Sequence, residues 1–582
     1  MYSKKFCYGG ETLKKQSFLK SSAILLSMVI ITKVLGLMYK IPLTHILGGT
    51  GMGYFSAAFS IFTPIFAIVV SGIPSAMAKM SAENYALGRY SNLRKQKISA
   101  HITFGLMSIA ACAIIMLFSV PLSEYVINQP AARFTLMCVA PSVVFCTAMS
   151  VERGYYEGLR NMLPTALSEI AETIFKVAFG LGAAVITAER ANNAFLKSGK
   201  FLGFALIDGQ TPEEAALPFV AAAAILGSTL ASGLACLLLV IGTRIKGDGI
   251  TEKMLKSDLI TDSTKHHAKV LLHSAMPIAM AAVITTMTGM VDMLTIAPCI
   301  CRAMDKTFLP FQKLLDMGVS ASELPNFMYG SYEGLAVLVY GLVPTLTAMF
   351  GKSALPSLAD AWTRKDKESF AAYLKNMMTV SSLIAIPSGL GICVLAREAL
   401  MFLFSGRTAE IEAAVQPLAV LGIGVIFFAI TLPCFTVLQT LGSPAKTIVI
   451  IAAGGVLKLL LNVILIPYAQ LNLTGAAIAE TVSSAFVCIL TVRETYHLGG
   501  VKCSRLETYV KPSYAGAMCA ATALLCKRIL NNGGLTALNH RFITIICVAT
   551  GGIMYLFSLI LLCETPKKLI KYGFSKKITK NS

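Results

Sequence analysis

Charged side chains inside apolar segments are the residues of this sequence best placed to do chemistry. The stretch LLSMVIITKVLGLMYKIPL, residues 25–43, carries Lys33 and Lys40 within a run of Leu, Ile, Val and Met. The two lysines are seven residues apart, so they share one face of a helix. A lysine near the centre of a bilayer costs roughly 2.5–3.5 kcal/mol. Two of them on one helix face therefore indicate a function, and an anionic ligand is the partner that they suit.

Four further apolar segments contain ionisable residues. Lys33, Lys40, Lys176 and Lys458 are predicted to line a water-filled cavity and bind the anionic substrate, whereas Asp292, Glu172 and Glu480 are candidates for gating or ion coupling. A structural alternative stays open for each residue, because a buried ion pair can also lock helices together. Glu172 and Lys176 are four residues apart and could pair within one helix. Asp292 could bind a cation, pair with a lysine or act as a gate.

The elements that must position these residues are membrane-spanning helices. Of the 582 residues, 55% are hydrophobic and only 14% are charged, with mean hydropathy +0.70, whereas soluble proteins have about 25% charged residues. Polar residues are confined to short gaps between apolar runs of about 20 residues, the length that crosses a bilayer. The pattern predicts an all-α polytopic membrane protein with fourteen spans, at 20–46, 54–76, 99–120, 132–151, 163–188, 216–243, 269–298, 331–351, 377–397, 414–440, 446–467, 473–493, 511–530 and 541–563.

The basic residues predict the orientation. The net charge is +20, but Lys and Arg gather in alternate gaps between spans, which predicts a multi-pass cell-membrane protein with both termini cytoplasmic. No RNA-binding motif and no basic stretch with interleaved aromatic residues is present, so a nucleic-acid partner is not expected. The fifteen cysteines are scattered, and only Cys299 and Cys301 come close together. We therefore expect no metal site and no cofactor.

An internal repeat predicts the architecture. Pro74 and Pro356 are 282 residues apart, as are Lys176 and Lys458, and Pro164 and Pro444 are 280 apart. The repeat predicts two pseudo-symmetric six-helix lobes followed by two extra helices. It also favours an alternating-access transporter with its site between the lobes. The predicted parts are a cytoplasmic tail 1–19, an N-lobe 20–243, a basic cytoplasmic linker 244–268, a C-lobe 269–493, the region 494–563 and a basic cytoplasmic tail 564–582.

Several stretches carry a family resemblance. They include ERGYYEGLRNMLPTALSEIAETIFKVAFG, SAMPIAMAAVITTMTGMVDMLTI, TAMFGKSALPSLADAW and PCFTVLQTLGSPAKTIVIIAAGGVLKLLLNVILIP, in an order that runs from about residue 17 to 495. In these stretches the chain resembles the SpoVB/YtgP-type polysaccharide biosynthesis family. That family is MurJ-like, includes lipid II flippases, and belongs to the multidrug/oligosaccharidyl-lipid/polysaccharide (MOP) exporter superfamily, whose fold is MATE-like.

The resemblance implies a flippase that moves an undecaprenyl-pyrophosphate-linked cell-wall precursor, lipid II or a related oligosaccharide, from the inner to the outer leaflet. It implies alternating access without ATP hydrolysis, driven by an H⁺ or Na⁺ gradient or by the membrane potential. Lys33, in TKVLG, matches the SRVLG pattern of relatives and is the leading candidate for the pyrophosphate contact. Membrane lipids and cell-wall synthases are the implied partners, and the absence of charges in GGTGMGYFSAAFSIFTPIFAI favours the sporulation branch.

Two other functional classes remain as alternatives. A cation-coupled multidrug exporter of the same superfamily would need an acidic or aromatic cavity, but the spans carry four lysines and the only tryptophan is Trp362, in a predicted loop. A membrane enzyme such as a glycosyltransferase would need a carboxylate–metal cluster, and none is evident. The sequence therefore favours a transporter without catalytic residues.

Overall fold

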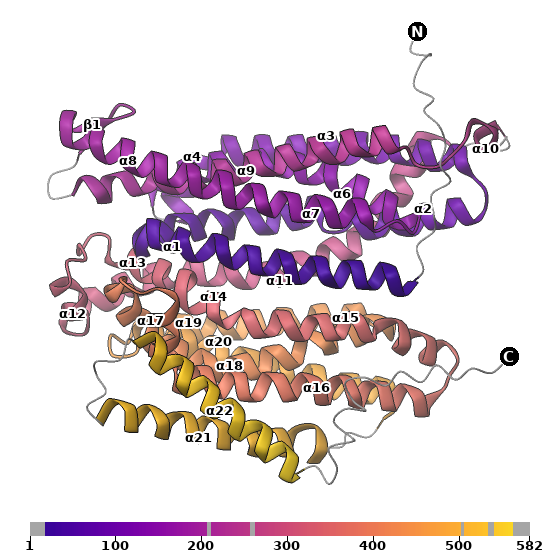
Figure 1. The fold of residues 1–582 in the computed structure, drawn as a ribbon. Coiled ribbons are helices and arrows are strands. Elements are labelled where there is room, and N and C mark those ends of the chain that lie inside the picture. The colour runs from indigo at the N-terminus through magenta and orange to yellow at the C-terminus, as the bar shows by residue number, and fades with distance from the viewer. Residues whose placement is uncertain are drawn as a thin grey trace. The chain divides into compact units, whose positions relative to one another are not determined.

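Helices make up nearly all of the described chain (Figure 1). The structure, a computed structural model, describes residues 18–127, 129–206, 211–256, 262–501, 506–532 and 540–562. The predicted tails lie outside these residues, except that Phe18 and Leu19 begin the first helix. The chain divides into two compact units, Met1–Leu294 and Thr295–Ser582.

The first unit is a helical bundle with one short hairpin. Its elements are α1 (Phe18–Val70), α2 (Ile73–Ala86), α3 (Tyr90–Leu117), α4 (Ser119–Pro121), η1 (Leu122–Val126), η2 (Pro130–Ala132), α5 (Arg133–Val139), α6 (Ser142–Gly158), α7 (Leu163–Phe175), η3 (Lys176–Gly180), α8 (Leu181–Ser198), β1 (Lys200–Phe201), β2 (Phe204–Ala205), α9 (Pro212–Lys246), α10 (Glu252–Lys256) and most of α11 (Thr264–Lys306). The two strands pair antiparallel, with Lys200 opposite Ala205 and Phe201 opposite Phe204.

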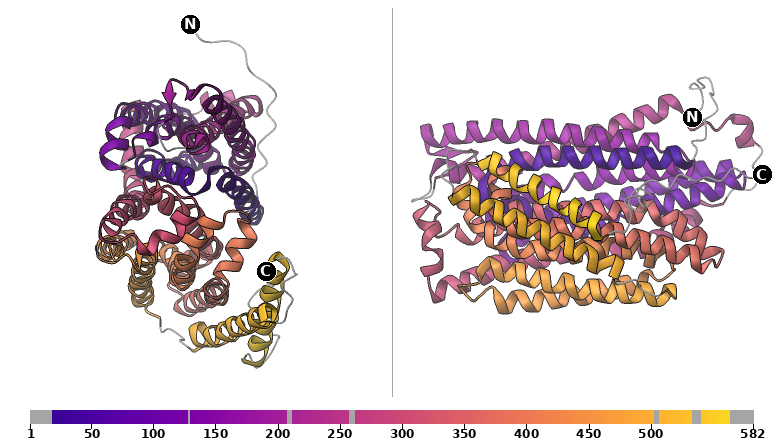
Figure 2. Two further views of the ribbon diagram at one scale, coloured as in Figure 1. Left: turned by 90° about the vertical axis from the view of Figure 1, so that its left-hand side faces the viewer. Right: turned by 60° about the horizontal axis from the view of Figure 1, so that its bottom comes forward.

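The second unit is helical throughout its described residues. Its elements after α11 are η4 (Leu309–Phe311), α12 (Gln312–Asp316), α13 (Leu324–Ser331), η5 (Tyr332–Ala336), α14 (Val337–Tyr340), α15 (Leu342–Thr363), α16 (Lys367–Val394), α17 (Ala396–Leu403), α18 (Thr408–Thr440), α19 (Pro444–Leu465), α20 (Asn472–Gly499), η6 (Leu506–Val510), α21 (Lys511–Asn532) and α22 (His540–Leu562). Figure 2 shows the long helices within each unit running side by side.

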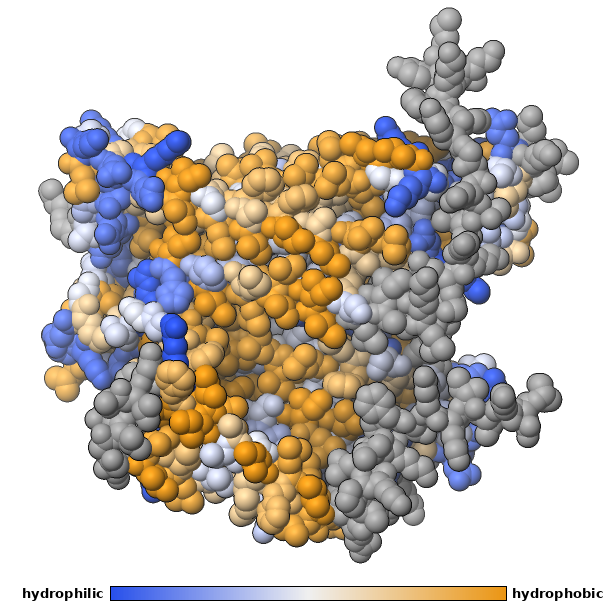
Figure 3. Space-filling view, viewed as in Figure 1, coloured by the Kyte–Doolittle hydropathy of each residue, from blue (hydrophilic) through white to orange (hydrophobic). Residues whose placement is uncertain are grey.

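The helices are long and apolar enough to cross a membrane. Eleven helices in the described residues meet that test, and the bent pair Leu324–Tyr340 and Leu342–Leu355, at 41°, makes a twelfth. One of the eleven, Ser27–Ala86, has 60 residues and overlaps the two predicted spans 20–46 and 54–76, and α21 covers the predicted span 511–530. Each of the fourteen predicted spans thus overlaps a helix, and the count of fourteen is consistent with the structure. In Figure 3 hydrophobic surface covers the middle of the helices and hydrophilic residues gather near their ends.

Local sequence explains where two helices break or begin. Within α1, Gly48 has φ 59° and ψ −168°, and two helices meet there at a kink. Glycine adopts this left-handed φ at little cost, and the kink falls in the gap between the predicted spans 20–46 and 54–76. Helix α9 begins with a capping box, because the Thr211 hydroxyl accepts from the Glu214 backbone N–H and the Glu214 carboxylate accepts from the Thr211 N–H.

The segment after α9 packs onto the first unit. Asp248 accepts a hydrogen bond from the Tyr155 hydroxyl at 2.9 Å and lies 3.5 Å from the Arg94 guanidinium. Further along, the Ser91 hydroxyl donates to the Leu255 carbonyl and the Ser99 hydroxyl to the Thr264 carbonyl. The described part of the predicted linker 244–268 is therefore tied to α3 and α6. The division between the two compact units falls within α11, after Leu294. The lobe limits 20–243 and 269–493 therefore remain predictions.

Candidate functional site

The rotation of α1 is set by Tyr39. Its side chain is buried, and its hydroxyl lies 3.0 Å from the Ser228 hydroxyl of α9. Gly180, the last residue of η3, lies against the same ring so closely that an added Cβ would be 2.7 Å from a ring carbon. Because successive residues of a helix are about 100° apart, an inward Tyr39 places Lys33 and Lys40 together on the neighbouring face.

The two lysines of α1 differ in exposure. Lys33 is exposed, among the exposed apolar side chains of Ile30, Val34 and Met38, and forms no ion pair within the described residues. Lys40 is half-buried. The structure therefore leaves the charge of Lys33 without a neutralising acid among the described side chains, which is the condition an anion site needs.

Glu172 and Lys176, which could have paired within one helix, do not form an ion pair. Glu172 instead lies 3.1 Å from Arg153 of α6 and accepts a 2.9 Å hydrogen bond from Ser232 of α9. Lys176 opens the π-helical segment η3, is half-buried, and has no ion-pair partner in the part of the chain that the structure describes. Wide π-helical turns are frequent at functional sites, and η3 packs against α1.

Arg153 is the residue of this network that the sequence did not reveal. Its Nε donates to the Ser168 hydroxyl at 2.8 Å, and its guanidinium also approaches Glu169 at 3.7 Å. The predicted span 132–151 stops two residues before it, so Arg153 counted as a loop residue, whereas α6 runs on to Gly158. The Arg153 guanidinium, with five donors in a fixed fork, holds both carboxylates of α7. The acids of α7 are therefore paired and Lys176 is not.

The corresponding lysine of the second unit, Lys458, is paired with an acid. Lys458 is buried, and its ammonium lies 2.6 Å from the Glu480 carboxylate. Glu480 also accepts hydrogen bonds from the Tyr340 hydroxyl at 3.0 Å and from the Ser484 hydroxyl at 3.3 Å, and the Tyr340 ring stacks on Phe428. Lys458 and Glu480 thus form one buried, hydrogen-bonded pair.

The remaining predicted residue is Asp292. It is buried in α11 of the first unit, away from water. One turn further, in the second unit, Thr295 accepts a hydrogen bond from the buried amide of Asn462 at 2.8 Å. Within the described residues no group of three or more His, Cys, Asp or Glu side chains could hold a metal ion.

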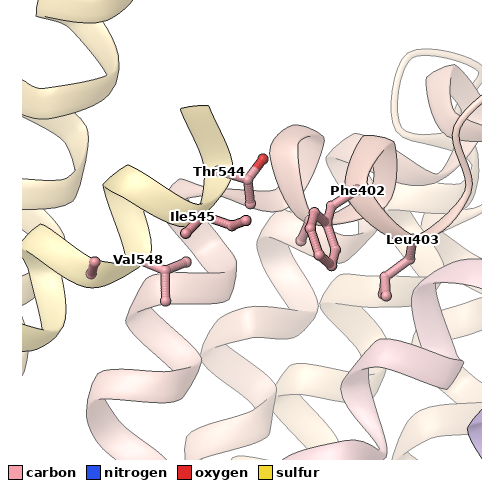
Figure 4. A pocket seen from close by; sticks show the side chains of 7 residues that line it. Phe402, Leu403, Thr544, Ile545 and Val548 are labelled. Atoms are coloured by element: carbon pink, nitrogen blue, oxygen red, sulfur yellow. The ribbon is translucent and has the colours of Figure 1, made fainter. Parts of the chain in front are cut away.

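An apolar pocket lies in the second unit between α17 and α22. It has a volume of about 460 Å³. Figure 4 shows Phe402 and Leu403 of α17 on one side and Thr544, Ile545 and Val548 of α22 on the other. Its lining holds no charged side chain, so it suits a hydrocarbon chain.

Comparisons with known proteins show what the whole chain is similar to. A family model described as "Polysaccharide biosynthesis protein" matches residues 18–189, and one described as "Lipid II flippase MurJ" matches residues 331–550. Stage V sporulation protein B of Bacillus subtilis (strain 168) is 22% identical over 479 residues, 82% of this chain and 83% of the relative. Lipid II flippase MurJ of the same organism is 21% identical over 477 residues, 79% of each chain. The chain is a relative of these proteins.

Solved structures show the same fold. The lipid II flippase MurJ in an inward closed conformation matches with a TM-score of 0.62 and 13% identity, over 95% of this chain and all of that one. A multidrug resistance MATE family transporter of the MOP superfamily, facing inward, matches with a TM-score of 0.57 and 12% identity, over 82% of this chain and 98% of that one. The predicted resemblance is confirmed, and so is the all-helical fold, which the chain shares with these two solved structures.

Proposed function

We propose that this protein is a transporter that flips an undecaprenyl-pyrophosphate-linked cell-wall precursor, lipid II or a related oligosaccharide, across the cytoplasmic membrane by alternating access. One observation carries the proposal: Lys33 and Lys176 lie on packed elements, α1 and η3, and neither meets an acid among the described residues. The names of the relatives, a lipid II flippase and a sporulation protein, support the substrate class.

The diphosphate is proposed to bind at Lys33, Lys40 and Lys176. Lysine holds phosphate as a point charge with three donors, so the site tolerates a headgroup that turns as it crosses. The acids nearby do not compete, because Arg153 holds Glu169 and Glu172. The apolar pocket of the second unit, between α17 and α22, is proposed as a separate site for a hydrocarbon chain.

The finer parts of the mechanism are also proposals. An H⁺ or Na⁺ gradient or the membrane potential is the energy source, since each charge moved is worth about 2.3 kcal/mol per 100 mV. Asp292, Glu172 and Glu480 are proposed for gating or ion coupling. Lys458, which the sequence assigned to the diphosphate, is paired with Glu480 and would have to leave that acid to bind it. Both termini are proposed to be cytoplasmic, with cell-wall synthases as partners.

The test is transport by the purified protein in vesicles. An impermeant quencher measures how much fluorescent lipid II reaches the outer leaflet. Efflux of a cationic dye is measured in parallel on the same vesicles. We expect lipid II movement without dye efflux. Dye efflux without lipid II movement would instead support the multidrug exporter. Depletion in cells should cause a lipid-linked precursor to accumulate, and mass spectrometry of that precursor identifies the sugar.

A further inference from the structure

Besides the apolar pocket of the second unit, the protein has a cavity in its first unit, and the proposed transport site does not use it. It lies between α7 and α9, at the end where α7 begins and α9 ends, and has a volume of about 340 Å³. Small-molecule sites are commonly clefts of about 300–1,000 Å³. The cavity is therefore large enough to hold part of a ligand.

One side of the cavity is apolar. Leu163 and Leu167 of α7 and Leu238 of α9 line it, and all three side chains are exposed at the surface, by 40%, 55% and 46%. Exposed leucines on a spanning helix suit hydrocarbon rather than water. This side therefore offers a path for an acyl chain.

The other side of the cavity is polar and basic. Lys246, in the last turn of α9, and Asn161, just before α7, line it. Lys246 is exposed and has no ion-pair partner in the described part of the chain. The Tyr156 hydroxyl is occupied, because it donates to the carbonyls of Thr243 and Gly247. Tyr156 thus fixes the turn that carries Lys246 and leaves ligand binding to the lysine.

The basic residues near this cavity indicate which leaflet it faces. Arg160 directly precedes the lining residue Asn161, and Arg244 lies two residues before the lining residue Lys246. Such clusters of basic residues predict the cytoplasmic end of a bundle. The cytoplasmic leaflet carries anionic lipids, whose attraction for each nearby Lys or Arg is appreciable. A basic end next to an apolar groove complements a phosphate headgroup with its acyl chain.

We propose that this cavity binds an anionic phospholipid of the cytoplasmic leaflet, with the phosphate at Lys246 and Asn161 and one acyl chain along Leu163, Leu167 and Leu238. The cavity wall includes Ser168, whose hydroxyl accepts the hydrogen bond from Arg153. A bound lipid therefore supports the face of α7 that holds the Arg153–Glu172 pair. The site is independent of the substrate that the transporter moves.

The experiment is a lipid titration of the purified full-length protein, followed by native mass spectrometry. Phosphatidylglycerol and phosphatidylcholine with the same acyl chains are compared. We expect tighter binding of phosphatidylglycerol and about a fivefold loss of its affinity in Lys246→Gln. Gly242→Leu should also reduce binding, because Gly242 lines the cavity and an added Cβ there meets no atom within 4 Å.

Matched controls separate the site from general effects. Lys265→Gln removes an exposed lysine from the same predicted face, and Gly182→Leu fills open space elsewhere, since a Cβ at Gly182 also meets nothing within 4 Å. Both should bind phosphatidylglycerol like the wild type. The thermal unfolding temperature of each variant shows whether it folds. If Gly242→Leu does not fold, Lys246→Gln still tests the proposal.

Three results would overturn the proposal. Equal affinity for the two phospholipids would remove the role of the phosphate charge. An equal loss in Lys265→Gln and Lys246→Gln would reduce the effect to surface charge. Displacement of phosphatidylglycerol by an equal concentration of undecaprenyl phosphate, or by inorganic phosphate, would assign the cavity to the carrier or to a free anion.

Discussion

At the scale of single residues, the lysines of this protein divide into two kinds. Lys33 and Lys176 meet no acid among the described side chains, whereas Lys458 is buried against Glu480. A lysine without an acidic partner can form an ion pair with an anionic ligand. A buried lysine that is already paired must first break its ion pair. The two kinds therefore call for different measurements.

For Lys33, the measurement is transport. Lys33→Ala and Lys176→Ala should each lower lipid II flipping by about tenfold or more, since a charged hydrogen bond is worth roughly 1.5–3 kcal/mol. Lys33→Arg should keep most of the activity, because the charge remains. Lys197→Ala, at an exposed lysine at the end of α8, is the control. Wild-type flipping in Lys33→Ala would refute the phosphate role.

For Lys458 and Glu480, the measurement is stability. Glu480→Gln removes the carboxylate that lies 2.6 Å from the buried Lys458 ammonium, which we expect to cost roughly 3–5 kcal/mol of unfolding free energy. The double variant Lys458→Met/Glu480→Leu should recover most of that loss. Thermal unfolding in detergent is measured for the wild type, Glu480→Gln and the double variant.

A matched ion pair joins the same two helices. Lys446 of α19 and Glu494 of α20 lie 2.9 Å apart but are 45% and 30% exposed, so Glu494→Gln should cost less than about 1 kcal/mol. If Glu480→Gln and Glu494→Gln lowered the unfolding temperature equally, the buried pair would have no special role in stability.

At the scale of elements, the contact between α1 and η3 positions the proposed diphosphate site. Gly180→Ala should cost roughly 1–3 kcal/mol of stability and shift Lys176, because the new methyl group meets the Tyr39 ring at 2.7 Å. Gly182→Ala is the control, since its methyl group meets nothing within 4 Å and alanine favours a helix by up to about 1 kcal/mol. Thermal unfolding and the flipping rate report the two effects, and equal behaviour of the two variants would contradict the packing argument.

At the scale of the whole molecule, the prediction concerns topology. A fluorescent protein fused to the C-terminus of the full chain should fluoresce in the cytoplasm. Alkaline phosphatase inserted at Gly203, in the turn between β1 and β2, should be active outside. Fourteen spans and the positive-inside rule require both results. A C-terminus on the outside would mean an odd number of spans.

The fold was largely predictable because it follows from composition. Apolar runs long enough to cross a bilayer must become helices, since unsatisfied backbone groups are costly in lipid. Every predicted span accordingly overlaps a helix, including 331–351, which lies just before Pro356, and 446–467, which lies just after Pro444. The kink at Gly48 falls between the predicted spans 20–46 and 54–76, where glycine tolerates the left-handed φ.

The candidate site was predictable only in part. Spacing along one helix suggested that Glu172 pairs with Lys176, but Arg153 and Ser232 reach Glu172 from α6 and α9. The repeat made Lys176 and Lys458 equivalent, but Glu480 of α20 reaches Lys458, whereas no acid among the described side chains lies within ion-pair distance of Lys176. Only the second lysine therefore finds an acid.

The sequence by itself determined that this chain is a helical membrane protein with lysines in its spans, because hydrophobicity and charge act locally along the chain. The tertiary structure decided which of those lysines keep their charge available. That choice depends on which helices bring Arg153 to Glu172 and Glu480 to Lys458, and contacts between helices far apart in the sequence leave no periodic signal in it.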